Sequence, residues 1–196
     1  AHPYFFSGFM ERPDVVAAGL LAVARVARTR FYVPPGMVVA PGGGLTRIGM
    51  LDPVVTNTAE GLRFESFSVC CGVYARLDVE ASALDAAHCA VGVTNVDVNQ
   101  PLRADLSSLS AGETLHLVVG EEGLTATTLD EEVTAEKVPL SLRWLKGFAE
   151  TQMLSSAMMP LHALNAAQAR AFIRGLPKSS ATGTGMWAGR AVRGLR

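Results

Sequence analysis

Leu62–Val79, with the sequence LRFESFSVCCGVYARLDV, is the stretch that decides the fold. Apolar and polar side chains alternate through most of it, most regularly from Val73 to Val79. Alternation with a period of two predicts a strand with one buried face. In the first half, the alternation places one set of side chains on a common face: Leu62, Phe64, Ser66 and Ser68. At the centre, Gly72 beside Cys70 and Cys71 indicates a bulge or a close backbone approach. We therefore expect a central pair of strands that meets at a tight packing point.

The segments on either side of this pair predict further antiparallel strands. Residues 54–58 precede the turn Ala59-Glu60-Gly61, so we expect a hairpin there. Residues 115–139 contain short apolar runs separated by acidic turns, which predicts a meander. Residues 80–93 are ambiguous between a short helix and an irregular crossing. The acidic turn residues are interpreted as a solvated edge.

Four segments carry helix signals. Residues 14–28 have an apolar stripe at helical spacing, namely Val16, Leu20, Val23 and Ala27. A second helix is expected from Asn99, as N-cap, to about Leu109. A third should occupy residues 141–159, with this apolar face: Leu142, Leu145, Phe148, Ala149 and Gln152 or Met153. A fourth begins at Asn165 with Gln168 as its capping-box partner, and its apolar side holds Ala169, Phe172, Ile173 and Leu176.

Length and composition favour one α+β domain over residues 1–176. The chain has 196 residues, of which 49% are hydrophobic and 18% charged, so it can bury a sizeable core. We expect mainly antiparallel sheets, covered by an N-terminal helix and two C-terminal helices. The aromatic residues 1–12 should pack onto the domain. Residues 177–196 are glycine-rich and basic, and we interpret them as a linker or the start of a further domain.

Charge and cysteine content narrow the functional classes. With 17 basic and 18 acidic residues, no global field draws in nucleic acid or a membrane surface. Three cysteines, two of them adjacent, suit a reducing compartment, so we expect a cytoplasmic protein. No apolar run has the length of a membrane span. Because the chain begins with Ala and runs straight into AHPYFFSGF, we expect it to be a piece of a longer polypeptide.

Cys70 and Cys71 are the candidate catalytic residues. A nucleophilic cysteine needs a lowered pKa and a base within hydrogen-bond reach, and His88 or His116 could be that base if the fold brings it close. A thiol-dependent enzyme is therefore one alternative function. The favoured interpretation is that the two cysteines are buried packing residues, because free cysteine is among the most buried residue types. The sequence does not decide between a functional and a packing role for Cys89.

Metal and phosphate binding are poorly supported by the spacing. Adjacent cysteines rarely both reach one tetrahedral zinc centre, and the same applies to the adjacent pair His88 and Cys89. The other histidines are isolated in the sequence: His2, His116 and His162. The glycine triplet at 42–44 lacks the lysine of a phosphate loop. The string TNVDVN lacks the glycine and glutamate of a calcium loop, so we expect turn and cap roles for its polar residues. No cofactor or metal site is expected within this chain.

Nucleic-acid binding is a second alternative. It would use Arg25, Arg28 and Arg30 together with the basic tail and Trp187. A glycine-rich stretch with a few cations is more often a solvated linker. Arginines scattered over opposite faces would not form a binding patch.

Several segments resemble the N-terminal region of bacterial SWIM zinc finger family proteins. The similar segments are YFFSGF, VARTRFYVPP, LDPVVT, LRFESFSVCCGVYARLDV, TNVDVNQPLR, LHLVVG, VPLSLRWLKGFAETQ and ARAFIRGLP. The resemblance spans most of residues 4–177. It implies a non-enzymatic interaction or scaffold module with a protein partner. The family's zinc site, a Cys-x-Cys and Cys-x-His pair, would lie downstream, so zinc and any nucleic-acid contact are expected only of the full-length protein.

Overall fold

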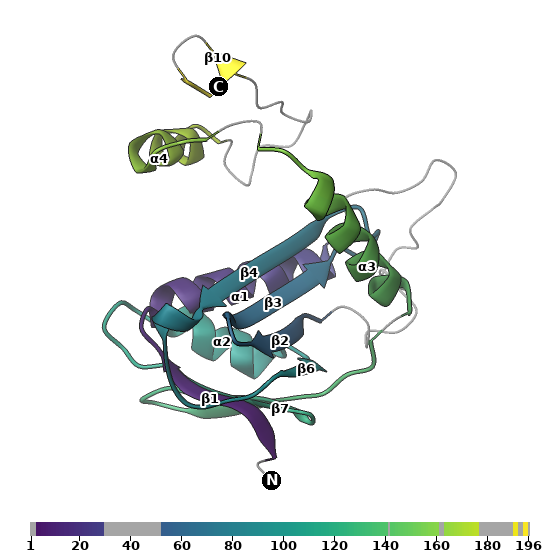
Figure 1. Cartoon of the computed structure of the whole chain (residues 1–196). Coiled ribbons are helices and arrows are strands. Elements are labelled where there is room, and N and C mark those ends of the chain that lie inside the picture. Colours follow the sequence, from purple (N-terminus) through teal and green to yellow (C-terminus); the bar gives the residue numbers. More distant parts are fainter. Residues whose placement is uncertain are drawn as a thin grey trace, which may run out of the picture. The chain divides into compact units, whose positions relative to one another are not determined.

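The structure is a computed structural model that describes residues 3–29, 52–140, 142–160, 163–176, 190–191 and 194–195. These residues fall into two compact units, Ala1–Ala149 and Glu150–Arg196. The predicted α+β class is confirmed, because antiparallel sheets and helices make up the described chain (Figure 1). The expected boundary near residue 176 stays a prediction, and most of the tail lies outside the described residues.

The hairpin predicted at the centre of the chain is confirmed. Strands β3 (Gly61–Phe67) and β4 (Tyr74–Glu80) pair antiparallel, with Phe67 opposite Tyr74 and Gly61 opposite Glu80. The four residues predicted to share one face of the first strand are all buried, namely Leu62, Phe64, Ser66 and Ser68. Strand β2 (Val54–Thr58) forms the expected second hairpin with β3, and β6 (Gly92–Asn95) completes a sheet of order β4-β3-β2-β6.

A five-stranded sheet has the order β5-β1-β7-β8-β9. Strands β7 (His116–Gly120), β8 (Gly123–Thr127) and β9 (Glu132–Glu136) are the predicted meander, which is confirmed. The aromatic N-terminal segment packs onto the domain as expected, but it does so as a strand, β1 (Tyr4–Met10). The ambiguous residues form a short 3-10 helix, η2 (Ala81–Ala83), and the edge strand β5 (Leu84–Cys89).

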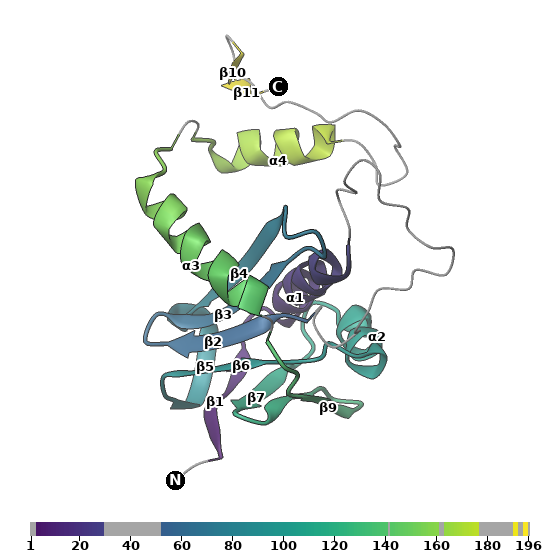
Figure 2. The same ribbon diagram turned by 90° about the vertical axis from the view of Figure 1, so that its right-hand side faces the viewer.

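The same order of elements, a strand, a helix and three further strands, occurs twice along the chain and connects the two sheets. One half runs from β1 through helix α1 (Pro13–Arg28) to β2, β3 and β4. The other runs from β6 through helix α2 (Gln100–Ser108) to β7, β8 and β9. In each half the first strand pairs with the other half's meander, β1 with β7 and β6 with β2 (Figure 2). A seam between the sheets therefore lies where β1 and β6 begin.

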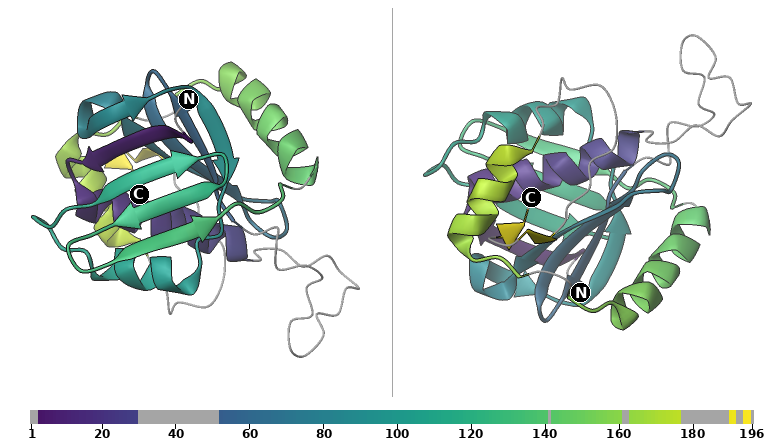
Figure 3. Two further views of the ribbon diagram at one scale, coloured as in Figure 1. Left: turned by 90° about the horizontal axis from the view of Figure 1, so that it is seen from below. Right: turned by 90° about the horizontal axis from the view of Figure 1, so that it is seen from above.

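Helices α1 and α2 supply much of the core. The predicted stripe of α1 is buried against β3 and β4, and the Ser66 hydroxyl donates to the Val23 carbonyl oxygen at 2.7 Å. Asn99 is the predicted cap of α2, since its Oδ1 accepts from the Leu102 amide at 2.9 Å. Figure 3 shows the five-stranded sheet in front of α1 in the view from below. One continuous apolar cluster joins both helices to both sheets.

The predicted apolar face of the third helix, α3 (Leu142–Ala157), is wrong except at Phe148. Leu142 is 83% exposed and Leu145 is 49% exposed, whereas Trp144 is buried. The reason is the position of Phe67 on β3, whose ring meets Phe148 at 5.0 Å and Trp144 at 6.0 Å between centroids. The face of α3 that packs on β3 is therefore the one that carries Trp144 and Phe148, because these rings contact Phe67. The rest of the expected face is also unburied in α3, namely Ala149, Gln152 and Met153.

The second unit contains α4 (Ala166–Gly175) and two short strands. The predicted capping box is present, because the Gln168 amide donates to Asn165 Oδ1 at 2.9 Å and the Asn165 amide donates to Gln168 Oε1 at 3.0 Å. None of the helix's apolar side chains is buried: Ala169, Phe172, Ile173 and Leu176. Strands β10 (Arg190–Ala191) and β11 (Gly194–Leu195) pair antiparallel.

Candidate interaction site

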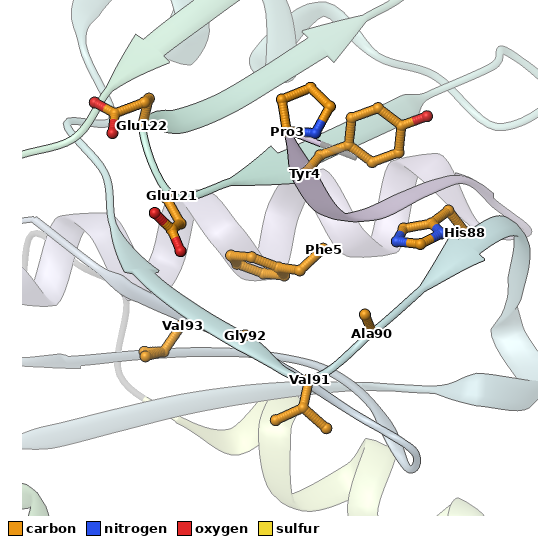
Figure 4. A pocket seen from close by; sticks show the side chains of 10 residues that line it. All are labelled: Pro3, Tyr4, Phe5, His88, Ala90, Val91, Gly92, Val93, Glu121 and Glu122. Carbon is orange, nitrogen blue, oxygen red and sulfur yellow. The ribbon is translucent and has the colours of Figure 1, made fainter. Parts of the chain in front are cut away.

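A pocket of about 740 Å³ opens at the seam between the sheets (Figure 4). Three segments that are distant in sequence form it: the start of β1, the chain from β5 into β6, and the turn between β7 and β8. Its ten lining residues are Pro3, Tyr4, Phe5, His88, Ala90, Val91, Gly92, Val93, Glu121 and Glu122. A volume of this size suits a side chain or a short stretch of peptide.

The floor of the pocket is the ring of Phe5. Phe5 is 7% exposed, and Gly92 lies directly against it. A Cβ on residue 92 would sit 2.2 Å from Phe5 Cγ, so only glycine fits at this position. The Ala90 amide donates to the Phe5 carbonyl oxygen at 2.7 Å, which fixes the two walls to each other.

The side chain of Asn57 on β2 forms hydrogen bonds to both of these segments. Its side chain is fully buried, and Nδ2 donates to the Ala90 carbonyl oxygen at 2.8 Å and to Cys89 Sγ at 3.1 Å. A longer bond of 3.4 Å reaches the Phe5 carbonyl oxygen. Its Oδ1 has no hydrogen-bond partner within the described residues. Buried polar groups are costly unless bonded, so this amide pins the pocket's backbone in one arrangement.

One end of the pocket is aromatic. The rings of Tyr4 and His88 meet edge to face, with centroids 5.4 Å apart and planes at 85°. Figure 4 shows His88 turned toward Tyr4, from the strand beside it. Val91 and Val93 stand at the rim and are 83% and 62% exposed. Their side chains point away from Phe5, because Gly92 between them faces the ring (Figure 4). The strand that lines the pocket therefore offers an apolar surface to solvent on its outer side.

The other end is acidic. Glu121 and Glu122 form the turn between β7 and β8, and both are exposed. Their backbone is fixed, since the Thr94 hydroxyl donates to the Glu121 carbonyl oxygen at 3.2 Å and the Lys137 amide donates to that of Glu122 at 2.8 Å. Gly123, with φ of 150°, completes the turn. Neither carboxylate forms an ion pair with a cation in the described chain.

Cys70 and Cys71 lie elsewhere, in the connection between β3 and β4. The Cys71 amide donates to the Ser68 carbonyl oxygen at 2.7 Å, and Cys71 adopts φ of 55°. Ser68 Oγ lies 3.3 Å from Cys70 Sγ. Both cysteines are partly exposed, in contrast to the full burial expected of packing residues, although Cys71 packs against the cluster of Ala27, Phe67 and Trp144. Cys89 is exposed.

The two candidate bases lie on the five-stranded sheet, whereas the cysteine pair lies in a turn of the four-stranded sheet. His88 is on β5 against Tyr4. His116 is on β7, with Nε2 3.2 Å from Ser7 Oγ and its ring 4.6 Å from that of Phe9. The thiol-dependent enzyme stays a hypothesis.

Arg28 is engaged within the fold. Its guanidinium donates to Asp52 at 3.0 Å, to Asp97 at 3.1 Å and to the Val98 carbonyl oxygen at 3.0 Å. Asp52 is buried, and this burial raises its pKa, while the hydrogen bond from Arg28 opposes the rise. Arg25 is exposed on α1. Arg30, Trp187 and the basic tail between 177 and 189 lie outside the described residues.

No three His, Cys, Asp or Glu side chains in the described part of the chain gather into a group that could hold a metal ion. No helix there is long and apolar enough to cross a membrane. The glycine triplet at 42–44, His2 and His162 lie outside the described ranges.

Comparisons with known proteins give no family. No protein-family model and no curated protein matches the sequence. Among solved structures, proliferating cellular nuclear antigen from Entamoeba histolytica has a TM-score of 0.49 at 10% identity, over 70% of this chain and 49% of that one. The DNA polymerase III subunit beta of Borrelia burgdorferi has 0.47 at 8%, over 72% and 32%. The DNA polymerase sliding clamp of Pseudomonas aeruginosa has 0.44 at 14%, over 68% and 30%.

In these three comparisons the chain spans between 30% and 49% of the other protein's length. With TM-scores below 0.5, the likeness carries no argument about function. The candidate site therefore depends on its own geometry.

Apart from His88, a candidate base for the cysteine pair, the residues of this pocket are not among the site residues expected from sequence. One signal pointed toward them, namely the aromatic segment 1–12 that was expected to pack down. The acidic turn at Glu121 was interpreted only as a solvated edge, and the role of Gly92 depends on a ring from a segment far away in sequence.

Proposed function

We propose that this chain is a non-catalytic protein-interaction module that binds an extended segment of a partner protein at the Phe5 pocket. The observation that carries the proposal is the combination of a buried aromatic floor with solvent-exposed valines at its rim. Exposed apolar side chains grouped around a concave surface are typical of binding sites. The backbone around the pocket is held by Asn57 and by the Ala90–Phe5 hydrogen bond, so little ordering is needed on binding.

The chemistry of the lining favours binding over nucleophilic catalysis. The described lining residues include no serine, threonine, cysteine or lysine. These four side chains are the nucleophiles that a neighbouring base or a lowered pKa commonly activates, so catalysis of that kind has no nucleophile in this lining. The titratable groups there are Tyr4, His88 and the two glutamates, and the ring of His88 packs on Tyr4.

Panning a random displayed peptide library against the chain tests the proposal. We expect a family of related peptides whose affinity falls about tenfold or more in Val93→Asp, since the substitution puts a charge on the apolar rim. Leu129→Asp is the matched control, because Leu129 is also exposed but lies in the turn between β8 and β9. No enriched family, or equal binding to Val93→Asp, would overturn the proposal.

The same peptides separate this function from a thiol-dependent one. We expect the double variant Cys70→Ser, Cys71→Ser to bind them as the native chain does. The cysteine pair lies in the connection between β3 and β4, which contributes no residue to the pocket. Loss of binding in this variant would place the function at the cysteine pair instead.

The resemblance to SWIM zinc finger proteins supports a finer proposal, that the module is the N-terminal body of such a protein. Zinc and any nucleic-acid contact would then belong to a downstream finger. Reading the gene beyond the codon for Arg196 tests this directly. A Cys-x-Cys and Cys-x-His pair is the expected result, and its absence from the reading frame would remove the family assignment.

A further inference from the structure

We propose that the Phe5 pocket selects a basic side chain, so that the partner segment inserts a lysine or arginine there. This inference rests on the proposed function and adds the chemical class of the ligand. It depends on the apolar floor, the acidic turn at one end and the absence of lysine and arginine from the described lining residues. The partner is therefore a cationic peptide segment.

The shape and polarity of the pocket suit a long side chain with a charged head. The apolar stem of lysine or arginine can lie along Phe5 and the wall formed by residues 90–93, while the head stays near water beside the acidic turn. The aromatic rings at the other end add an apolar surface for the neighbouring part of the partner segment. A short or purely aliphatic side chain would use only part of this surface.

Glu121 provides the charge that the head requires. In Figure 4 its carboxylate lies on the Phe5 side of the turn, whereas that of Glu122 points away. Because neither is paired with a cation of the described chain, both negative charges remain available to a ligand. An acidic side chain in the pocket would meet a like charge, which disfavours it.

Another groove on this unit carries charges of both signs, with two arginines and three acidic residues in its lining. It has a volume of about 310 Å³ and is lined in part by Arg63, Arg76 and Asp78. Asp78 accepts from Arg63 Nε at 2.7 Å and from Arg76 Nε at 2.6 Å, so the charge of this carboxylate is already paired. The described lining of the Phe5 pocket, by contrast, holds two carboxylates and no lysine or arginine, which favours it as the site that selects a cation.

Peptides enriched in the panning experiment provide the test. Each lysine or arginine in them is replaced in turn by norleucine, which keeps the stem and removes the charge. We expect one position at which this replacement weakens binding about threefold or more, with a similar loss in Glu121→Gln. Glu131→Gln is the matched control, because Glu131 is an exposed acid in the turn between β8 and β9.

Exchanging the charges of the peptide side chain and of Glu121 then tests whether these two groups are in contact. A peptide with glutamate at the sensitive position should bind Glu121→Lys better than it binds the native chain. If peptides bind at the pocket but norleucine and Glu121→Gln leave their affinity unchanged, this inference is wrong and the interaction function stands. If no peptide binds at all, the proposed function fails and the inference fails with it.

Discussion

Gly92 lies so close to Phe5 that a Cβ on residue 92 would fall 2.2 Å from the ring's Cγ. The contact joins β6 of the four-stranded sheet to β1 of the five-stranded sheet. It therefore forms both the floor of the pocket and part of the seam that holds the two halves together.

Gly92→Ala should destabilise the protein, because the added methyl group must displace the Phe5 ring. We expect the free energy of unfolding to fall by about 2 kcal/mol, as for other overpacked cores. Urea unfolding followed by circular dichroism measures it. Gly72→Ala is the control, with its nearest neighbour 3.6 Å away, and should change stability by less than about 0.5 kcal/mol.

A double variant identifies the cause of that loss. Phe5→Leu shortens the side chain that Gly92 faces, so adding it to Gly92→Ala should cost less than the sum of the two single changes. Strict additivity would mean that the alanine methyl group does not press on Phe5.

Arg28→Met should also destabilise the fold, because it leaves the buried Asp52 without its cation. Asp52 has a side chain that is 3% exposed, whereas that of Arg28 is 34% exposed. We expect a loss of about 2 kcal/mol, below the cost for a fully buried pair because solvent screens the arginine. Arg12→Met, which removes an ion pair at the protein surface, should have little effect. Equal losses in the two variants would contradict the account.

The pH dependence of stability should show the raised pKa of Asp52. Burial raises this pKa in the folded state, so the contribution of the group is fully present below the unfolded-state pKa and is lost as pH rises through the folded-state value. Asp52→Asn removes the titration. We expect the unfolding free energy of the native protein, relative to that of the variant, to fall between about pH 3 and about pH 7. A relative stability that rises over this range would show that Arg28 lowers the pKa instead.

Alanine substitutions on α3 test which face of the helix packs. Trp144→Ala should cost about 3 kcal/mol, because Trp144 is 4% exposed and packs on Phe67. Leu142→Ala should change stability by less than about 0.5 kcal/mol, since that side chain is 83% exposed. Thermal unfolding of the two variants compares their stabilities. A larger loss of stability in Leu142→Ala than in Trp144→Ala would show that the face expected from sequence is the one that packs.

Local signals account for most of what could be predicted. The hairpin at Leu62–Val79, the stripe of α1, the cap at Asn99 and the capping box at Asn165 each depend on residues close together in sequence. The meander from His116 to Glu136 was predictable for the same reason. Tight turns set its register, and apolar residues alternate along its strands.

The rest depends on distant partners. Strand β1 pairs with β5 and β7, and neither is near it in sequence. The packing face of α3 was set by Phe67, because that ring selects Trp144 over the leucines of the same helix. The pocket needs Phe5, Gly92 and Glu121 to meet from three segments. The periodicity of apolar residues within one segment does not indicate which distant segments it will contact.

The most direct test of the interaction function is to map where an enriched peptide binds, using NMR amide chemical shifts of the native chain. The account predicts that the largest shifts gather at Tyr4, Phe5, Glu121 and residues 90–93. The amides of Cys70 and Cys71 should stay in place. Shifts gathered at the cysteine turn or along α3, with the amides of the pocket unmoved, would contradict it.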